Sequence, residues 1–202
     1  MISCTGIFRT MREIAPGIHH WSARHPNTGM GASSYWLRDL GVLVDPIAVP
    51  DEVAGVQEIL LSNRHHLRDS LEASERFGAT IRAPCVGMHE FDEDDPIEPY
   101  DFGDELAVGT VTAYEVDSIC PDEAALYVPA ARALSVADGV THYGDELEFV
   151  SDNLMDEPEQ TKAGLKRAYA RLCDELEFEH LLPAHGTPIV GEGRELLRDF
   201  AA

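Results

Sequence analysis

The sequence predicts an α/β fold, based on a strand–helix–strand unit and a long amphipathic helix. Residues 57–62 form a compact apolar run typical of an interior strand, and a helix is expected from about Asp69 to Phe77. Gly78 suits the left-handed position that ends many helices, and a second strand is expected over 79–83. A strand, a helix and a strand in this order predict two parallel strands.

The clearest helix is predicted over 161–177, where large apolar residues recur on one face of a helix of period 3.6. These residues are Leu165, Tyr169, Leu172 and Leu176. A short strand over 180–183 and a last helix over about 191–200 are expected to follow. The apolar face of the long helix is expected to pack on the core.

The other elements are mostly strands. A strand broken by a Pro-Gly turn is expected over 12–22, followed by a hairpin formed by 34–38 and 41–46. A short helix is expected over 51–56, and the acidic segment 92–104 is expected to be an exposed connection. The remaining strand-like runs are 105–108, 110–116, 124–129 and 131–136.

Length and composition predict one domain spanning 1–202, since 44% of the 202 residues are hydrophobic and no internal repeat or linker interrupts the chain. No apolar run reaches the roughly 18 residues of a membrane span, and the N-terminus lacks a secretory pattern, so a cytoplasmic protein is predicted. The four cysteines are too far apart for a Cys-x-x-Cys motif. Cys4, Cys85, Cys120 and Cys173 are therefore expected to be free thiols, with Cys85 and Cys173 buried.

Charge is the strongest compositional signal. The chain has 37 acidic residues against 15 lysines and arginines, a formal net charge of −22. A salt-adapted, halophile-type surface is the favoured interpretation, and a basic partner is the alternative. Binding to nucleic acid or to anionic lipid is disfavoured in both cases.

Three loops with polar residues follow the carboxyl ends of apolar strands, namely 63–68, 138–142 and 184–187. In α/β proteins such strand ends converge on the functional site. In this order the elements resemble the metallo-β-lactamase superfamily, over most of the chain. The segments that carry the resemblance are Ala15-Pro16-Gly17-Ile18, Ser34-Tyr35-Trp36-Leu37, Val44-Asp45-Pro46, Ile59-Leu60-Leu61-Ser62, Leu134-Ser135-Val136-Ala137-Asp138-Gly139 and Leu182-Pro183-Ala184-His185-Gly186. The resemblance implies an αββα sandwich of two mixed β-sheets flanked by helices.

In that superfamily the first loop reads His-x-His-x-Asp-His, and two zinc ions are held by these residues, a further His, a bridging Asp and a final His. The resemblance places His65, Asp138 and His185 at ligand positions. The other ligand positions carry Asn63, Leu67, Arg68 and Ile119. Leucine and isoleucine have no lone pairs and arginine brings a fixed positive charge, so a two-zinc site is not expected. At most one zinc or other divalent ion is predicted, on His65, Asp138 and His185.

The functional prediction is a hydrolase-like protein of undefined substrate with a degenerate active site. His65 and His185 would act as ligands or acid–base groups, Asp138 as a ligand or an orienting group, and Arg68 as an anion clamp paired with Asp138. His66 would replace His65 if the loop register shifts by one residue. The alternative is a non-catalytic descendant of the fold that binds a small, anionic molecule or a partner protein, and a third possibility is a purely structural polar network.

Overall fold

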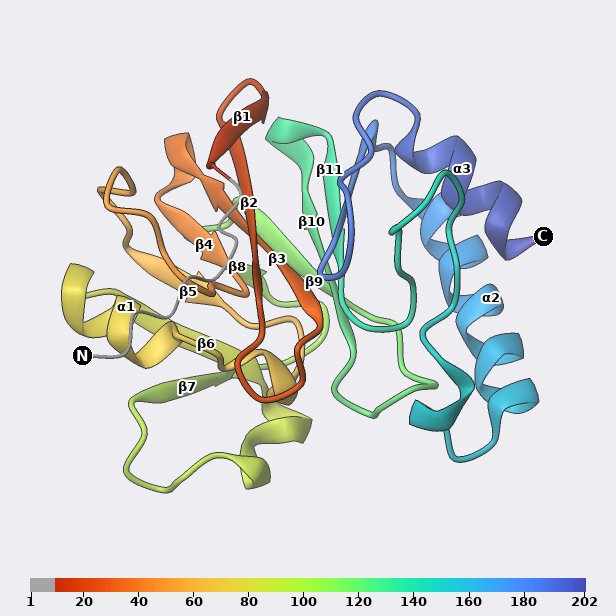
Figure 1. The fold of residues 1–202 in the computed structure, drawn as a ribbon, viewed down its shortest axis with the longest axis horizontal. Coiled ribbons are helices and arrows are strands. Elements are labelled where there is room, and N and C mark those ends of the chain that lie inside the picture. Colours follow the sequence, from red (N-terminus) through yellow and green to blue (C-terminus); the bar gives the residue numbers. More distant parts are fainter. Residues whose placement is uncertain (1–9) are drawn as a thin grey trace.

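The computed structural model describes residues 10–202, and its strands form two mixed sheets packed face to face (Figure 1). The first sheet has seven strands in the order β1-β2-β3-β4-β5-β6-β7. Pairing is antiparallel from β1 to β4 and parallel from β4 to β7. The strands are β1 Arg12–Ala15, β2 Ile18–Arg24, β3 Gly31–Leu37, β4 Val42–Val44, β5 Glu58–Leu60, β6 Thr80–Pro84 and β7 Ile97–Tyr100.

The second sheet has five strands in the order β12-β11-β10-β9-β8. Only the pairing of β11 with β12 is parallel. The strands are β8 Glu105–Leu106, β9 Val111–Glu115, β10 Ala124–Val128, β11 Ala133–Val136 and β12 His180–Pro183.

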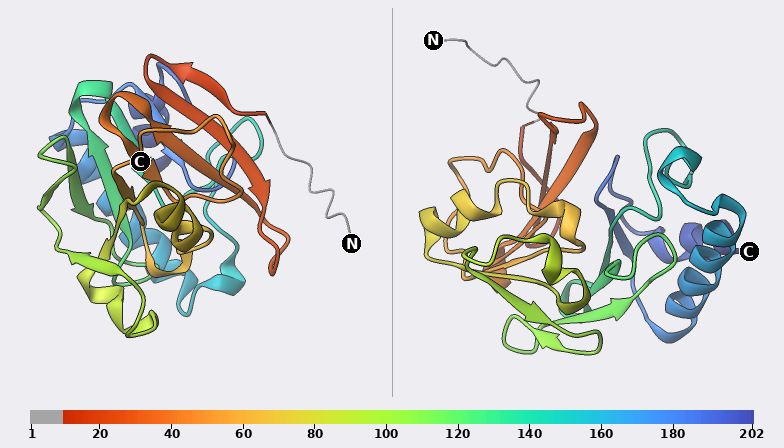
Figure 2. Two further views of the ribbon diagram at one scale, coloured as in Figure 1. Left: turned by 90° about the vertical axis from the view of Figure 1, so that its left-hand side faces the viewer. Right: turned by 90° about the horizontal axis from the view of Figure 1, so that it is seen from below.

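Over residues 10–202, three α-helices cover the outer faces of the two sheets. Helix α1 (Ser70–Phe77) lies on the side of the first sheet, and α2 (Pro158–Glu175) and α3 (Gly193–Ala201) lie together on the opposite side of the molecule (Figures 1 and 2). The result is the predicted αββα sandwich. Short 3-10 turns lie at η1 Arg38–Leu40, η2 Arg64–His66, η3 Cys85–Glu90, η4 Pro129–Ala131 and η5 Asp152–Leu154.

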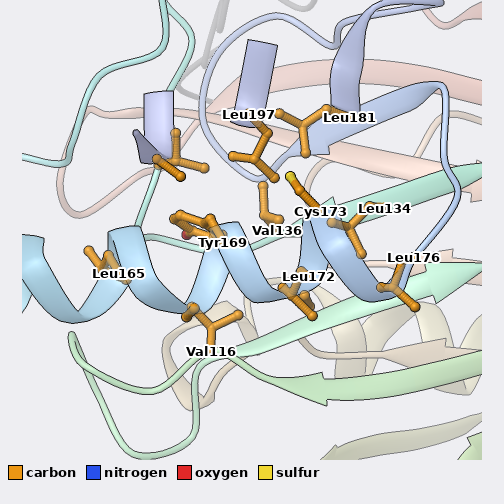
Figure 3. Close-up of a cluster of buried hydrophobic side chains, with 14 of the residues drawn as sticks. Val116, Leu134, Val136, Leu165, Tyr169, Leu172, Cys173, Leu176, Leu181 and Leu197 are labelled. Carbon is orange, nitrogen blue, oxygen red and sulfur yellow. The ribbon is translucent and has the colours of Figure 1, made fainter. Parts of the chain in front are cut away.

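The predicted apolar stripe of the long helix is confirmed. Helix α2 begins three residues earlier and ends two residues earlier than expected, so Leu176 directly follows its last residue. The stripe residues are almost completely buried against β11, β12 and α3 (Figure 3). They are Leu165, Tyr169, Leu172 and Leu176. Gly78 ends α1 at φ 66°, and β5 and β6 are parallel, which confirms the predicted strand–helix–strand unit.

Alternation along the strands fills two separate layers of the core. In β4, Val42 and Val44 point between the sheets, whereas Leu43 points toward α1. In β5, Leu60 points between the sheets and Ile59 points toward α1. Because both faces of this sheet are covered, consecutive residues of its central strands are apolar, without the alternation of a strand that has one face in water.

Several sequence-based expectations are wrong. Residues 51–56 contain a turn and no helix, and the supposed connection 92–104 contains strand β7. Cys85 is exposed at the start of a 3-10 turn, while Cys173 is buried as expected. Cys4 lies outside the described residues. None of the helices between residues 10 and 202 combines the length and the hydrophobicity that a bilayer crossing requires.

Candidate metal centre

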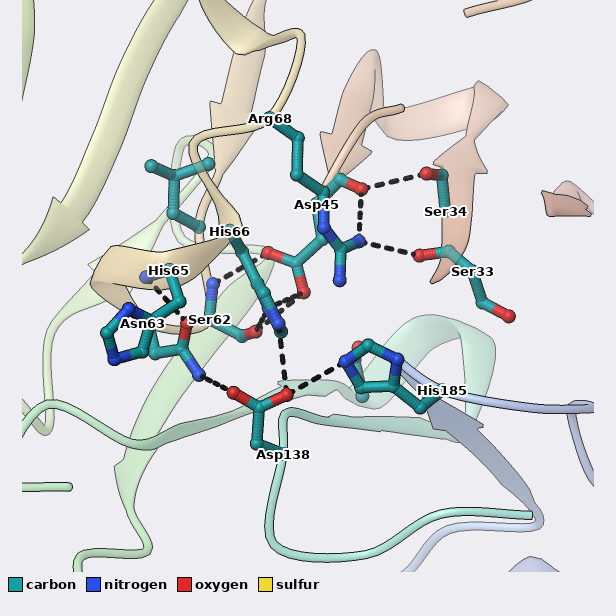
Figure 4. A network of polar contacts seen from close by, with 12 residues as sticks. Ser33, Ser34, Asp45, Ser62, Asn63, His65, His66, Arg68, Asp138 and His185 are labelled. Atoms are coloured by element: carbon teal, nitrogen blue, oxygen red, sulfur yellow. Dashed lines mark hydrogen bonds and ion pairs between the residues drawn. The ribbon is translucent and has the colours of Figure 1, made fainter. Parts of the chain in front are cut away.

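Three side chains bring metal-binding atoms together where the two sheets meet. They are His66, Asp138 and His185, whose ligand atoms all lie within 4.8 Å of one another. The Nε2 atoms of His66 and His185 lie 3.2 Å and 2.9 Å from Asp138 Oδ1 (Figure 4). Both imidazoles are therefore directed at one carboxylate oxygen.

Each of these residues follows the carboxyl end of a strand. His66 lies in the loop after β5 of the first sheet, whereas Asp138 and His185 follow the parallel neighbours β11 and β12 of the second. The sheets are joined beside them, since the Ser33 amide donates to the Ala184 carbonyl and the Tyr35 hydroxyl donates to the Pro183 carbonyl. The prediction that three strand-end loops converge is confirmed.

The outer nitrogen of His66 is held by buried side chains. Its Nδ1 lies 3.0 Å from Asp45 Oδ2 and 2.9 Å from Ser62 Oγ, and the Ser62 hydroxyl donates to the same Asp45 oxygen at 2.6 Å. The Ser62 amide donates to Asp45 Oδ1. Because an ionised carboxylate accepts only, Nδ1 of His66 carries a hydrogen, and in the neutral ring Nε2 offers its lone pair.

The outer nitrogen of His185 is held by the main chain. Its Nδ1 lies 2.8 Å from the carbonyl oxygen of Gly31, which also accepts from the Tyr143 hydroxyl at 2.9 Å. A carbonyl oxygen cannot donate, so Nδ1 of His185 also carries the hydrogen. In its neutral form His185 thus presents the Nε2 lone pair to Asp138.

These constraints make the centre a binding place for positive charge. Two lone pairs and a carboxylate oxygen face one another, and only a proton or a metal cation between them removes the repulsion. Burial and the Arg68 charge oppose protonation of His66, but Asp45 and Asp138 outweigh them and raise the pKa of His66 to about 9. Burial would raise the pKa of Asp138, yet His66 and His185 hold it well below its ordinary value.

The three residues fit a tetrahedral divalent metal. Nitrogen and oxygen ligands at about 2.0–2.2 Å from zinc lie about 3.3–3.6 Å from one another. The two separations from Asp138 Oδ1, 3.2 Å and 2.9 Å, would have to widen by roughly 0.1–0.7 Å to admit the ion. Two histidines and one carboxylate with fixed outer nitrogens are a known catalytic ligand set that leaves one position open.

A cavity of about 550 Å³ adjoins the three ligands. This volume is typical of sites for small molecules. Its lining includes Arg64, Arg68, His65 and His25 as well as the ligands themselves. The open position of the centre would therefore be accessible to a small molecule.

The second oxygen of Asp138 faces a different environment. Asn63 Nδ2 donates to Asp138 Oδ2 at 2.9 Å and to Glu123 Oε2 at 3.2 Å, while its Oδ1 accepts from the His65 amide. Glu123 is fully buried, and burial together with the Asp138 charge raises its pKa to about 8. The Gly139 amide donates to its other oxygen. An amide group thus occupies the space between two carboxyl groups.

The structure separates His65 from the predicted site. Asn63 caps the 3-10 turn η2, and this turn leaves His65 exposed beside Asn63 while His66 points to Asp138 (Figure 4). The group that could hold a metal ion is therefore His66, Asp138 and His185, with the register shifted by one residue from the prediction. The sequence contains no signal that shows which of the two adjacent histidines, His65 or His66, points to Asp138.

The predicted ion pair of Arg68 with Asp138 is also wrong. Arg68 donates from Nη1 to the carbonyl oxygens of Ser33 and Asp45, at 3.1 Å and 2.9 Å, whereas Asp138 pairs with His66 and His185. Arg68 still lines the cavity. Asp45 and Ser62, which orient His66, were seen in the sequence only as parts of strands.

No protein-family model matches the sequence, and no curated protein matches it significantly. Solved structures do match. The DIM-1 metallo-β-lactamase has a TM-score of 0.71 and 13% identity, over 95% of this chain and 96% of that one. Rubredoxin oxygen:oxidoreductase from Desulfovibrio gigas has a TM-score of 0.66 and 14% identity, over 95% and 61%. A mutant flavo di-iron protein from Thermotoga maritima has a TM-score of 0.69 and 16% identity, over 98% and 62%.

The chain thus has the metallo-β-lactamase fold, as its sequence predicted. It spans about three fifths of the length of the rubredoxin oxygen:oxidoreductase and of the flavo di-iron protein, and nearly the whole length of the lactamase. At these identities the likeness concerns the fold.

Proposed function

We propose that this chain is a hydrolase that uses one divalent metal ion, zinc in the first instance, held by His66, Asp138 and His185. The substrate would be a small ester, thioester, amide or phosphoester bound in the adjoining cavity. The observation that carries the proposal is the convergence of two Nε2 atoms on one carboxylate oxygen, with both Nδ1 atoms bonded to acceptors. A bound ion of this kind polarises a carbonyl or phosphoryl group and makes water more acidic.

The residues around the ligands have separate tasks in this proposal. Asp45 and the Gly31 carbonyl orient the two imidazoles and keep their Nε2 lone pairs available. The buried Ser62 holds Asp45 through two hydrogen bonds. Arg68 supplies a positive charge at the cavity wall, where it would stabilise negative charge on the substrate.

A single ion is favoured over two because the far oxygen of Asp138 is occupied. The Asn63 amide donates to it and to Glu123, and a donor N–H cannot act as a ligand. The neighbouring Ile119 offers no lone pair. The Oδ2 side of Asp138, with Asn63 and Ile119 in place of ligands, therefore supports the sequence-based prediction that at most one ion binds.

The test is metal content, measured by elemental mass spectrometry on protein purified without chelator. We expect about one metal ion per chain in the wild type and near zero in His66→Ala, because one of three ligands is lost. His65→Ala is the matched control, since its ring lies outside the cluster on the same turn, and it should keep the metal. Equal metal content in the two variants would contradict the proposed ligand set.

Activity is tested next with chromogenic esters, thioesters and phosphoesters. Hydrolysis that is abolished by a chelator, restored by zinc and absent in His66→Ala would support a hydrolase. A metal-loaded protein that cleaves none of them would contradict the catalytic part of the proposal.

The second candidate is a non-catalytic protein that binds a small anion. It is favoured by one observation, namely that protons alone can hold the cluster together, since His66 lies between the carboxylates of Asp45 and Asp138. Wild-type protein without metal, but with measurable affinity for small anions, would support this candidate over the hydrolase.

A further inference from the structure

The cavity beside the centre has a charge opposite to that of the whole molecule. The chain carries a net charge of −22, yet two arginines and four histidines line this cavity against one carboxylate, Asp138. The lining cations and imidazoles are Arg64, Arg68, His25, His65, His66 and His185. A local inversion of this kind concentrates anions at the site.

Arg68 is the cation in this lining that is left for a ligand. Arg64 is paired, because its Nη1 lies 3.4 Å from Asp122 Oδ1 and its amide donates to the other oxygen of that buried carboxylate. Burial and the nearby Arg68 charge lower the pKa of His25, which disfavours a positive charge on this ring. Over residues 10–202, Arg68 donates only to carbonyl oxygens, which carry no formal charge.

The carboxylates near Arg68 are already committed. Asp45 Oδ2 binds His66 and Ser62, and Asp138 Oδ1 binds both histidines. With a divalent ion in the centre, these two carboxylates balance the ion, and the charge of Arg68 remains unbalanced. Another guanidinium nitrogen of Arg68 is directed toward the side where His66 and His185 lie (Figure 4). A partly buried guanidinium of this kind suits an anionic carboxylate or phosphate, which accepts charge-assisted hydrogen bonds from its free N–H groups.

The remaining lining of the cavity is largely apolar. Its apolar residues are Met30, Ala32, Ile119, Val150 and Leu154. Leu154 lies in the 3-10 turn η5 and is 55% exposed, so a ligand that covers it would gain from the removal of apolar surface from water. The cavity therefore offers one positive charge and an apolar surface within about 550 Å³.

We infer that the substrate is an amphipathic organic anion, whose carboxylate or phosphate binds Arg68 and whose apolar chain or ring lies against Ile119, Val150 and Leu154. The inference rests on the proposed metal-dependent function, because the ion at His66, Asp138 and His185 leaves the Arg68 charge unbalanced. The hydrolysable bond would then lie between the anionic and the apolar ends, or beside the anionic end, within reach of the centre.

The experiment is equilibrium binding of three probes that cannot be hydrolysed, namely hexanoate, hexanol and acetate, measured by titration calorimetry or ligand-observed NMR on zinc-loaded protein. We expect hexanoate to bind at least about tenfold more tightly than either of the others, since it alone supplies both the charge and the apolar chain. Arg68→Gln should lower hexanoate affinity about tenfold or more and leave hexanol unchanged. Arg24→Gln, an exposed arginine outside this cavity, is the matched control and should change neither.

Leu154→Asp guards against misfolding of the Arg68 variant, because this half-exposed side chain is not part of the core. It should weaken hexanoate about tenfold or more, through lost apolar contact and added repulsion, with a smaller effect on hexanol. Equal binding of hexanol and hexanoate by the wild type, or an unchanged preference in both variants, would overturn the inference. A clear preference for hexanoate in a protein that cleaves no ester would overturn only the proposed catalysis.

Discussion

The two oxygens of one carboxylate, that of Asp138, face environments of opposite chemical capacity. Oδ1 faces His66 and His185, whose Nε2 atoms accept a cation. Oδ2 faces the Asn63 amide, which donates a hydrogen and is shared with Glu123. For the proposed metal site, the donor on one side and the acceptors on the other favour a single ion over two, although Asp138 itself has lone pairs on both oxygens.

The comparison also shows how the fold balances charge on each side. On the Oδ1 side, two ionised carboxylates, Asp45 and Asp138, surround the cation site. On the Oδ2 side, burial and the Asp138 charge raise the pKa of Glu123, so this carboxyl group stays neutral near pH 7. One side keeps the negative charge that a metal requires, and the other side removes it by protonation.

The largest effect is expected from Asp138→Asn, because this residue joins the two sides. The neutral amide is a weak ligand, and the two imidazoles lose their shared anion. We expect metal affinity to fall by more than about a hundredfold, beyond the range found for outer-shell partners. Chelator competition on purified protein measures it, and a decrease of less than about tenfold would contradict the assignment of Asp138 as a ligand.

A smaller loss is expected from Asp45→Asn, which acts on the Oδ1 side through His66. The change removes the carboxylate that accepts from His66 Nδ1, so the ring loses its fixed orientation and basicity. We expect metal affinity to fall about 10–100-fold. Asp39→Asn, in an exposed turn, is the control and should leave metal affinity unchanged. Equal affinities in the two variants would show that Asp45 does not position His66.

The smallest change in metal affinity, within about threefold, is expected from Glu123→Gln on the Oδ2 side, since a protonated carboxyl group and an amide resemble each other. Its effect is on the pH dependence of stability. The pKa of Glu123 is about 8 in the folded chain against an ordinary value of 4.5, so the folded chain binds one more proton between these pH values. The free energy of unfolding contributed by this group therefore decreases as pH rises from about 4.5 to 8.

Urea unfolding of wild type and Glu123→Gln at pH 5 and pH 8 tests this sign. The variant should gain stability relative to the wild type at the higher pH. A difference between the two proteins that is the same at both pH values would show that Glu123 is ionised throughout.

The fold was largely predictable because its signals are local and periodic. The stripe of α2, the β3–β4 hairpin and the β5–α1–β6 unit each follow from apolar spacing and from turn residues such as Gly78. Strand β7 was missed because it is an edge strand with Pro99 and exposed Glu98, and only Ile97 and Tyr100 are buried. The salt-adapted surface, the single domain and the cytoplasmic location stay predictions.

The site was predictable only in part because its decisive contacts join distant segments. Asp138 and His185 were predicted from the family resemblance, and the structure brings both into one group of possible ligands. The choice between His65 and His66 depends on the Asn63 cap. The partners of Arg68 are the carbonyl oxygens of Ser33 and Asp45, and because every residue has a carbonyl oxygen, the sequence does not identify them. Arg68 also has φ 43°, a conformation that a sequence gives no reason to expect at arginine.

The two histidines differ in how easily a mutation can disturb their outer nitrogens, because the outer nitrogen of His185 is bound by the carbonyl oxygen of Gly31. The outer nitrogen of His66 depends on two side chains, Asp45 and Ser62, so a single codon change at either position can disturb it. The outer nitrogen of His185 is held at 2.8 Å by a main-chain oxygen, which every amino acid possesses, and the Tyr143 hydroxyl lies farther away, at 3.4 Å. We therefore expect random mutations that disrupt this centre to act first on the partners of His66, and the orientation of His185 to be retained longer.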